Sequence, residues 1–450
     1  MLEDKRGCLQ LLLWEWVVEQ LTGLAGLLAF VFIAYALSEQ RKKISWKLVL
    51  WGMGLQIFLA LMVLGLPAAN FTGPLNQAFV WANAVILKIL EFTEEGSKFI
   101  FGQLLDTNTV GFVFAFKVLP TIIFMASLMA ILYHLGVMQL VVRGIAWIMQ
   151  KVMGTSGAES LSVAANIFVG QTEAPLVIRP YVATMTRSEL LAVMTGGMAT
   201  VAGGVMAAYV GLLKDRIPHI AGHLLTASVM SAPAALAIAK LLLPEVKTPE
   251  TLGTIPKNST QKIDRNLIEA AARGAGEGLS LALNVAAMLL AFIALIAMVN
   301  AILIAVGGWI GFDSWGAKAV PHLVANGKPA QLTFQLILGW IFSPMAWLMG
   351  IPWEEAGVAG TLLGEKLVLN EFVAYLHLSQ LANQLSDRSV LILSYALCGF
   401  ANFSSIAIQI GGIGGIAPTR KSDLAELGIR SVIGGTLAAF LTATIAGILI

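Results

Sequence analysis

The stretch Asn166-Ile-Phe-Val-Gly170-Gln-Thr-Glu173-Ala-Pro175 decides how this sequence folds. It places an amide, a hydroxyl and a carboxylate side by side in a chain that is otherwise strongly apolar. A carboxylate at bilayer depth costs about 2.5–3.5 kcal/mol on insertion scales unless it lines a cavity or meets a partner. Gly170 and Pro175 bracket the polar residues and disfavour a continuous helix. The stretch therefore predicts a polar pocket within the membrane, with a loop outside the bilayer as the alternative.

Composition indicates a membrane protein. Of the 450 residues, 58% are hydrophobic and 12% are charged, whereas soluble domains carry about 25% charged residues. A net charge of +2, without a basic stripe interleaved with aromatic residues, gives no support for nucleic-acid binding. Cys8 and Cys398 are far apart and lack metal-ligand spacing.

Eight apolar segments are long enough to cross a bilayer. They lie at about residues 21–37, 46–68, 112–134, 189–212, 222–243, 278–306, 390–413 and 430–450. Residues 72–100 contain Glu91, Glu94, Glu95 and Lys98, and are expected to form a helix lying in the interface. Residues 1–23 are an N-terminal extension to which the sequence gives no role.

Basic residues in short loops predict the orientation of these spans. Arg41, Lys42, Lys43 and Lys47 follow the first span, which puts that loop in the cytoplasm and the N-terminus outside. With eight spans the C-terminus returns to the outside. The loops after the third, fifth and seventh spans, which are then cytoplasmic, are richer in Lys and Arg than the outer loops.

Two further stretches, 157–185 and 333–363, are apolar but interrupted, and we expect each to form a re-entrant hairpin. The second contains Gly350-Ile-Pro352-Trp-Glu354-Glu355-Ala. Each hairpin precedes a span with small residues at its centre, and the two hairpins open to opposite sides. Matching interruptions in two halves of opposite orientation are typical of inverted-repeat secondary transporters. Glycines also serve close helix packing, which is the alternative for some of them.

The predicted pocket offers two sets of polar groups. Gln171, Thr172 and Glu173 would serve the edge of a planar heterocycle. A second set would serve hydroxyls, because a carboxylate that accepts from adjacent hydroxyls suits a sugar diol; it comprises Glu355, Asn402 and Ser405. Phe400 would offer a ring face to a flat base, or is one more core aromatic. Two carboxylates argue against an anionic solute.

A cation site is also predicted at the first hairpin. Half-helix ends leave carbonyls unpaired, and hard oxygens suit Na⁺. The side-chain oxygens of Asn166 and Thr200, with the carbonyls of Val169 and Val201, would form a neutral oxygen cage. The alternatives are that Asn166 caps a half-helix and that Thr200 bonds its own backbone.

At these residues the chain resembles the concentrative nucleoside transporter family. Three blocks carry the resemblance, which covers about residues 24–450. The first is the stretch 166–175, and the third is Cys398-Gly-Phe-Ala-Asn-Phe-Ser-Ser-Ile-Ala407. The second, Gly364-Glu-Lys366-Leu-Val-Leu-Asn370-Glu371-Phe-Val-Ala-Tyr375, fits the family signature Gly-x-Lys-x-x-x-Asn-Glu-Phe-Val-Ala-Tyr at every fixed position.

The resemblance implies an all-α polytopic membrane protein with eight transmembrane helices, two oppositely oriented hairpins and an inverted repeat. It further implies a homotrimer in the bacterial cytoplasmic membrane, with both termini periplasmic, that imports nucleosides such as uridine with sodium. The implied division is a scaffold with the interfacial helix at 24–155, a first transport repeat at 156–245, a cytoplasmic linker at 246–275, a scaffold helix at 276–310 and a second transport repeat at 331–450.

Site residues follow from the resemblance by position. Gln171, Thr172 and Glu173 are expected at the edge of the nucleobase, and Val205 and Phe400 on its faces. The ribose is expected to contact Glu355, Asn402 and Ser405. The expected sodium ligands are Asn166, Val169, Thr200 and Val201. Thr200 stands where sodium-using bacterial relatives often have Ser, and it keeps the hydroxyl. Some family members use protons, so proton-coupled nucleoside transport is the alternative.

Two other classes of function compete with this interpretation. Two intramembrane glutamates would serve as acid and base in an intramembrane enzyme. The chain offers no metal-binding cluster and no Ser-Lys or Ser-His nucleophile pair at membrane depth, so we do not expect an enzyme. The other alternative is a transporter of a different neutral solute, such as a sugar or an amino acid.

Overall fold

The computed structural model describes residues 20–66, 71–106, 110, 113–256, 264–319 and 331–450. Within these residues the regular structure is helical, apart from two isolated β-bridges. The predicted all-α membrane fold is thereby confirmed. Residues 1–19 of the N-terminal extension, with Cys8, lie outside the described residues.

The first part of the chain forms a run of helices that ends at the first hairpin. They are an unlabelled helix Gln20–Ala36, α2 Trp46–Leu64, α3 Asn76–Phe101, α5 Phe114–Lys117, α6 Leu119–His134 and α7 Val137–Met153. The predicted second span ends four residues early, because Gly65 takes a left-handed φ of 77° and terminates α2. α7, between two left-handed glycines, was not predicted.

The central and C-terminal helices include two pairs that replace predicted continuous spans. The span predicted at 189–212 is α9 Arg187–Ala199 followed by α10 Gly203–Leu213, and the one at 390–413 is α17 Asp387–Ala396 followed by α18 Phe403–Ile416. The long uninterrupted helices are α11 Ile220–Leu242, α12 Leu267–Trp309 and α19 Lys421–Leu449. α12 is followed by the short α13 Phe312–Ala319.

In the part of the chain that the structure describes, six helical segments are long and apolar enough to cross a membrane. They are Trp46–Leu64, Phe114–His134, Arg187–Leu213, Ile220–Leu242, Leu267–Trp309 and Pro418–Leu449. The helix Gln20–Ala36 and α18 are shorter apolar helices. All eight predicted spans therefore correspond to apolar helical segments, although two of them are broken.

The order of elements after α6 recurs after α12. In the first half α7 leads to a hairpin of α8 Gly157–Asn166 and η4 Ala174–Tyr181, then to the broken pair α9–α10 and to α11. In the second half α14 Phe334–Leu348 leads to α15 Trp353–Val368 and α16 Glu371–Leu381, then to the broken pair α17–α18 and to α19. This recurrence supports the predicted repeat.

The recurrence identifies an interrupted helix pair further along the chain than the predicted second hairpin. The bend predicted at Pro352 exists, since α14 and α15 meet at 117°. In the order of elements, however, the counterpart of α8–η4 is α15–α16, which is broken at residues 369–370. The pair α15–α16, residues 353–381, thus corresponds in order to the first hairpin, while α14–α15 keeps the bend predicted within 333–363. Glu371 is the first residue after the break of α15–α16, and Glu173 is the last residue of the first break.

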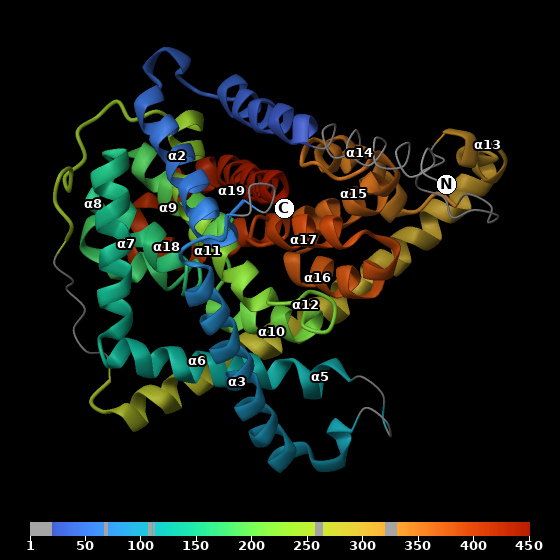
Figure 1. Ribbon diagram of the computed structural model, residues 1–450, viewed down its shortest axis with the longest axis horizontal. Coiled ribbons are helices and arrows are strands. Elements are labelled where there is room, and N and C mark those ends of the chain that lie inside the picture. The colour runs from blue at the N-terminus through green and yellow to red at the C-terminus, as the bar shows by residue number, and fades with distance from the viewer. Residues whose placement is uncertain (1–19, 67–70, 107–109, 111–112, 257–263, 320–330) are drawn as a thin grey trace.

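α11 and α19 lie between two groups of helices, with α7, α8 and α9 on one side and α14, α15 and α16 on the other (Figure 1). α9, α11 and α19 are almost wholly buried. α2 packs mainly on α11, and less extensively on α19 and α7. Phe30 contacts Phe440 with ring centroids 5.5 Å apart, and Gln56 Nε2 donates to Thr442 Oγ1 at 2.7 Å. These contacts join the first two helices to the centre formed by α11 and α19.

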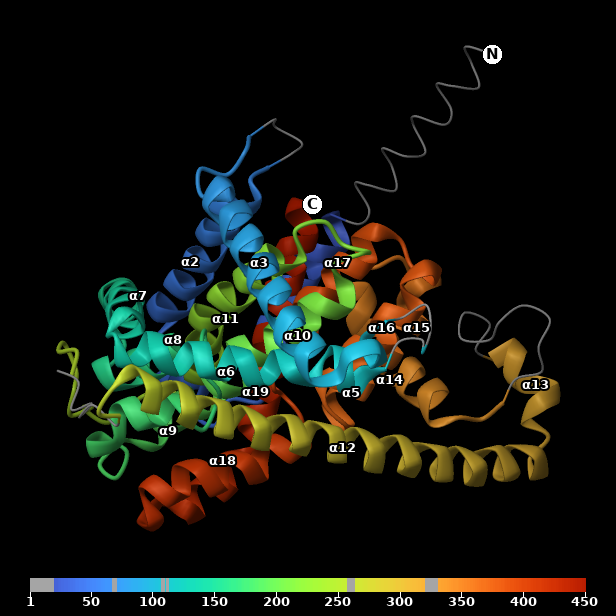
Figure 2. The same ribbon diagram turned by 90° about the horizontal axis from the view of Figure 1, so that it is seen from below.

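α12 packs on α6 and runs along one edge of the molecule (Figure 2). At 43 residues it is about 65 Å long, more than a bilayer's thickness. Gly274 and Gly278 allow the close approach, because a Cβ at either glycine would lie within 2.8 Å of Ala130 or Ala126. Most of the apolar surface of α12 remains exposed.

A buried ionic cluster fixes the base of the first hairpin. Ser156 and Thr186 each cap a helix, with Glu159 and Glu189 completing the two capping boxes. Ser156 Oγ donates to Glu189 at 2.6 Å. Lys240 Nζ lies 2.8 Å from Glu159 Oε2. α8, α9 and α11 are thus tied together where the hairpin starts.

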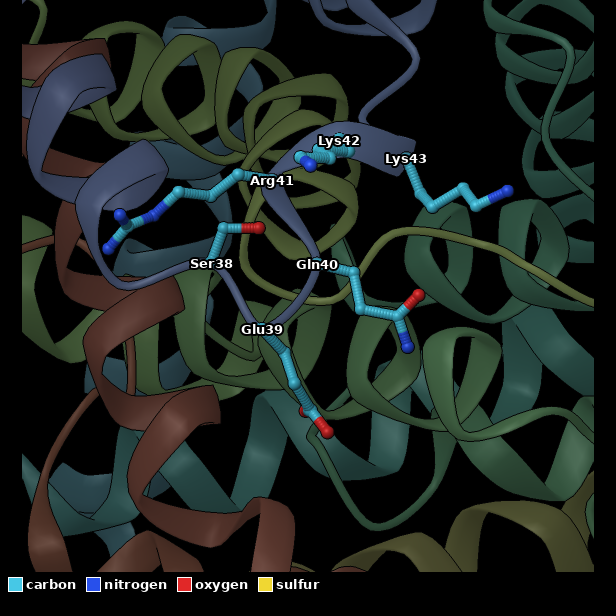
Figure 3. Close-up of a pocket in the computed structure, with 6 residues that line it drawn as sticks. All are labelled: Ser38, Glu39, Gln40, Arg41, Lys42 and Lys43. Atoms are coloured by element: carbon cyan, nitrogen blue, oxygen red, sulfur yellow. The ribbon is translucent and has the colours of Figure 1, made fainter.

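The basic loop after the first helix borders an open hollow of about 440 Å³ (Figure 3). Its lining is Ser38, Glu39, Gln40, Arg41, Lys42 and Lys43. This is the loop that the positive charges assign to the cytoplasm. All of the lining comes from one short segment, so the hollow is distinct from the predicted pocket.

Candidate functional site

The breaks of the two discontinuous helices touch in the interior. Gly399, between α17 and α18, has φ 148°, and a Cβ there would lie 2.8 Å from the carbonyl oxygen of Met198 and 3.0 Å from Ala199. Only glycine permits this approach. The end of α9 and the unwound segment after α17 are therefore in direct backbone contact.

The first hairpin reaches the same place. The Phe168 carbonyl accepts a hydrogen bond of 2.9 Å from Gly203 N, the first residue of α10. On the preceding turn, Val163 fills the space beside Gly196, whose Cβ position lies 2.7 Å from Val163 Cγ2. The irregular residues 167–173 thus lie against the break between α9 and α10.

Gln171 and Ser405 are brought together from the two halves of the chain. Gln171 Nε2 donates to Ser405 Oγ at 3.0 Å, and both residues are buried. Gln409, one turn further along α18, donates to Gln171 Oε1 at 3.0 Å and to Met194 O at 2.9 Å. The sequence interpretation missed Gln409, although a lone amide in the apolar run of α18 is the kind of residue that marks an intramembrane site.

Thr172 and Glu173 both lie in the hairpin turn and have different surroundings. Thr172 packs on α18, where a Cβ at Gly412 would lie 2.7 Å from its Cγ2. Glu173 is exposed. Its carboxylate folds back over Gly170, in the space that a Cβ would take. Gly170 is therefore required for this carboxylate to stay beside the turn.

Asn402 joins the second break to the second hairpin. Its Nδ2 donates to Glu371 Oε2 at 3.1 Å, and its Oδ1 accepts from the Ser405 backbone N–H at 2.9 Å as the N-cap of α18. Glu371 Oε1 accepts from the Tyr209 hydroxyl at 2.9 Å, so the carboxylate is held at both oxygens. Glu371 is only 5% exposed.

Glu355 takes a different place from the one predicted. Its two oxygens accept from the backbone N–H and the hydroxyl of Ser386, both at 3.0 Å, where α17 begins. No hydrogen bond among the described residues joins Glu355 to Asn402 or Ser405. The carboxylate that bonds Asn402 is Glu371, which the sequence interpretation quoted within the signature but did not place in the pocket.

Val205 and Phe400 lie on the two breaks that meet. Val205 is buried in the first turn of α10. Phe400 is half-buried, belongs to the unwound segment between α17 and α18, and packs against the main core. Their positions fit side chains that flank a solute from the two halves.

The predicted sodium ligands lie on segments that touch, since the residues around Asn166 pack against the break between α9 and α10. Asn166 is 1% exposed and donates through Nδ2 to Ser162 O at 3.2 Å, while its Oδ1 is buried without a partner among the described residues. A buried acceptor left unpaired costs about 1–3 kcal/mol. Thr200 Oγ1 donates to Gly196 O at 2.9 Å, so Thr200 bonds its own backbone, as the alternative hypothesis predicted. The lone pairs of this hydroxyl remain available to a cation.

The two backbone carbonyls of the predicted site are also without backbone donors among the described residues. In the part of the chain that the structure describes, no backbone hydrogen bond ends on the carbonyl of Val169 or of Val201. The donor set would be all oxygen and uncharged, which fits a monovalent hard cation.

Comparisons with known proteins identify the family of the chain. Three family descriptions match in chain order: "Na+ dependent nucleoside transporter N-terminus" over residues 25–104, "Nucleoside recognition" over 115–216 and "Na+ dependent nucleoside transporter C-terminus" over 223–447. The chain is a membrane transport protein of the nucleoside type. It belongs to the concentrative nucleoside transporter family.

Curated relatives extend over nearly the whole chain. An uncharacterized transporter of Haemophilus influenzae is 45% identical over 96% of this chain and 98% of its own length. The mouse sodium/nucleoside cotransporter 1 is 43% identical over 96% of this chain and 64% of its own length. The family assignment predicted from the signature is confirmed, and the homologues named are transporters, not enzymes.

A solved structure has the same fold. CNTnw in an inward-facing substrate-bound state is 44% identical and superposes with a TM-score of 0.84, covering 96% of this chain and 98% of that one. CNTnw has also been solved in an outward-facing state, in a doubly substituted form, with a TM-score of 0.84.

Proposed function

We propose that the protein is a secondary active symporter that imports nucleosides, driven by the sodium gradient. The observation that carries this proposal is the contact between two interrupted helices, with hydrogen-bonded polar side chains contributed by both halves. Gln171 and Ser405, 234 residues apart, are bonded directly. A polar site shared by two repeats is where inverted-repeat transporters bind their solute.

The polar groups of this site suit a nucleoside. Gln171, Thr172 and Glu173 would meet the base edge, and Val205 and Phe400 would pack on its faces. Asn402 and Ser405 would hold the ribose. The carboxylate for the ribose hydroxyls is Glu371 in place of Glu355, because Glu371 already accepts two hydrogen bonds beside Asn402. An anionic solute would be repelled by Glu173 and Glu371 together.

Sodium would bind at Asn166, Val169, Thr200 and Val201. The unpartnered Asn166 Oδ1 supports this assignment, since a cation would satisfy it. A neutral nucleoside that enters with one sodium ion gains about 2.3 kcal/mol per 100 mV of membrane potential. A tenfold sodium gradient adds about 1.4 kcal/mol. If transport were coupled to protons, which is the alternative, these uncharged oxygens would bind no cation.

We further propose that the protein forms a trimer in the bacterial cytoplasmic membrane, with both termini periplasmic. The long exposed apolar face of α12 supports the scaffold of residues 24–155 and 276–310, which includes α6 and most of α12, against which the two transport repeats move. Gly274 and Gly278 hold these two helices together. Alternating access would then be a displacement of the hairpins and the buried helices relative to that scaffold.

Counterflow of radiolabelled uridine in proteoliposomes tests the function. Uptake that needs sodium and is competed by other nucleosides is the expected result. Competition by sugars or amino acids alone would favour a transporter of another neutral solute. Conversion of uridine into base and sugar by the purified protein would favour an enzyme.

A further inference from the structure

The ends of α17 and α9 differ in whether their last carbonyl groups accept hydrogen bonds. In α17 each carbonyl of the last turn has a donor. Leu393 O and Tyr395 O accept from the backbone N–H groups of Leu397 and Cys398, at 2.8 and 3.1 Å. Ser394 O accepts from the Tyr375 hydroxyl at 2.6 Å. Ala396 O, the last of them, accepts from the ammonium of Lys366 at 2.8 Å.

At the end of α9 the corresponding carbonyls lack such donors. The hydroxyl of Thr200 reaches Gly196 O. Among the hydrogen bonds of the described residues, none from outside the helix ends on the carbonyls of Gly197, Met198 or Ala199. The last turn of α9 also holds no basic residue. A helix C-terminus carries about half a negative charge, so this end is left without a counter-charge.

Lys366 and Asn166 occupy corresponding places in the two hairpins. Asn166 is the last residue of α8, and Lys366 lies two residues before the end of α15. Both are buried, at 1% and 2% exposure. Asn166 lies on the arm that packs on the end of α9, while Lys366 bonds the end of α17 directly. Among the described residues, one hairpin carries a buried unpaired oxygen at this position, and the other carries a cation.

We propose that the Lys366 ammonium is a tethered cation that fills, in the second repeat, the place that sodium takes in the first. This inference rests on the proposed sodium site at Asn166. The ammonium lies within electrostatic range of Glu371 as well as on the α17 carbonyl end. Lys366 would therefore balance two negative groups beside the solute and leave the transporter with a single exchangeable ion site. Lys366 acts as a positioning residue, since it reaches the solute through Glu371.

Replacing the lysine by the residue of the other repeat tests the proposal. Lys366→Asn would restore an oxygen beside Ala396 O and remove the tethered charge. Charge moved per nucleoside, from simultaneous current and uridine flux at fixed potential, should rise from about one to about two, and sodium activation should become sigmoidal. Lys366→Arg keeps the cation, so this variant should still move about one charge per nucleoside, even if its transport rate changes. Lys151→Asn, at an exposed lysine of α7, is the matched control.

An active Lys366→Asn variant that still moves one charge per nucleoside, with unchanged sodium activation, would overturn the proposal. If that variant is not recovered folded, the double variant Lys366→Met with Glu371→Gln decides. Recovery of the double variant, where Lys366→Met alone fails, supports charge balance by Lys366, and failure of both contradicts it.

A separate result, the sodium dependence of uptake by the wild-type protein, tests the proposed function. Wild-type uptake without any sodium dependence would refute sodium coupling. Nucleoside binding would still test the lysine, because Lys366→Met should weaken binding at least about tenfold, and Lys366→Arg should recover most of the loss. Equal affinities of Lys366→Met and wild type would refute the tethered cation.

Discussion

Replacing Glu371 by glutamine changes the charge of the site with little change in shape. Glu371 accepts from the Tyr209 hydroxyl at 2.9 Å and from Asn402 Nδ2 at 3.1 Å. Glutamine keeps one acceptor oxygen and presents an NH₂ group to the other donor. If Glu371 also accepts from a ribose hydroxyl, that bond loses its charged acceptor.

The size of the effect follows from the strength of hydrogen bonds to charged groups. Such a bond is worth about 1.5–3 kcal/mol, against about 0.5–1.5 kcal/mol for a neutral one. The difference, about 1–1.5 kcal/mol for the bond to the solute, is a loss of roughly fivefold to tenfold in affinity. Reorientation of Asn402, which also caps α18, would add to this loss.

The assay compares uridine with deoxyuridine analogues that lack one ribose hydroxyl, by calorimetry or by competition for uptake. Glu371→Gln should weaken uridine binding and have little effect on the analogue that lacks the contacted hydroxyl. Glu355→Gln is the matched control, since Glu355 caps α17 through Ser386. It should cost about 0.5–2 kcal/mol of stability at most and affect uridine and its analogues alike. Equal losses for uridine and all analogues in Glu371→Gln would refute the role of Glu371 at the ribose.

Three further substitutions test other parts of the site. Glu173→Gln should alter the preference among nucleobases while the protein still purifies in its native assembly; unchanged uptake of every nucleoside tested would remove Glu173 from the base edge. Thr200→Ala should raise the sodium concentration for half-maximal uptake, and Thr200→Ser should be nearly neutral because it keeps the hydroxyl; identical sodium curves for both would argue against this ligand. Gly399→Ala should lower the melting temperature and abolish uptake, because its Cβ would meet Met198 O at 2.8 Å; a variant with wild-type uptake and stability would contradict the contact between the two breaks.

The first hairpin could be predicted because its signals coincide. Gly170, Pro175 and three polar residues interrupt an apolar stretch at one point. The long apolar helices α11 and α19 follow from hydropathy in the same way. Apolar length alone, however, does not reveal that a span is unwound at Thr200 or after Ala396, because the breaks depend on contact between the two halves.

The break between α15 and α16 was not predicted, for a physical reason. Glycine and proline mark the bend at Pro352, whereas the break at 369–370 contains neither. Its signal is an N-cap: the Asn370 side chain accepts from Val373 N at 2.9 Å and starts α16. Asn370-Glu371 also carries the acidic first-turn residue that such a start favours. Capping residues within an apolar run are therefore as informative here as helix breakers.

Simultaneous measurement of uridine flux and current in proteoliposomes, at fixed potential and pH, tests the central claim most directly. Uridine should accumulate against its gradient only when sodium is present outside, with inward positive current of about one charge per nucleoside. Full accumulation driven by a proton gradient in sodium-free buffer would contradict the sodium site at Asn166 and Thr200 and favour proton coupling.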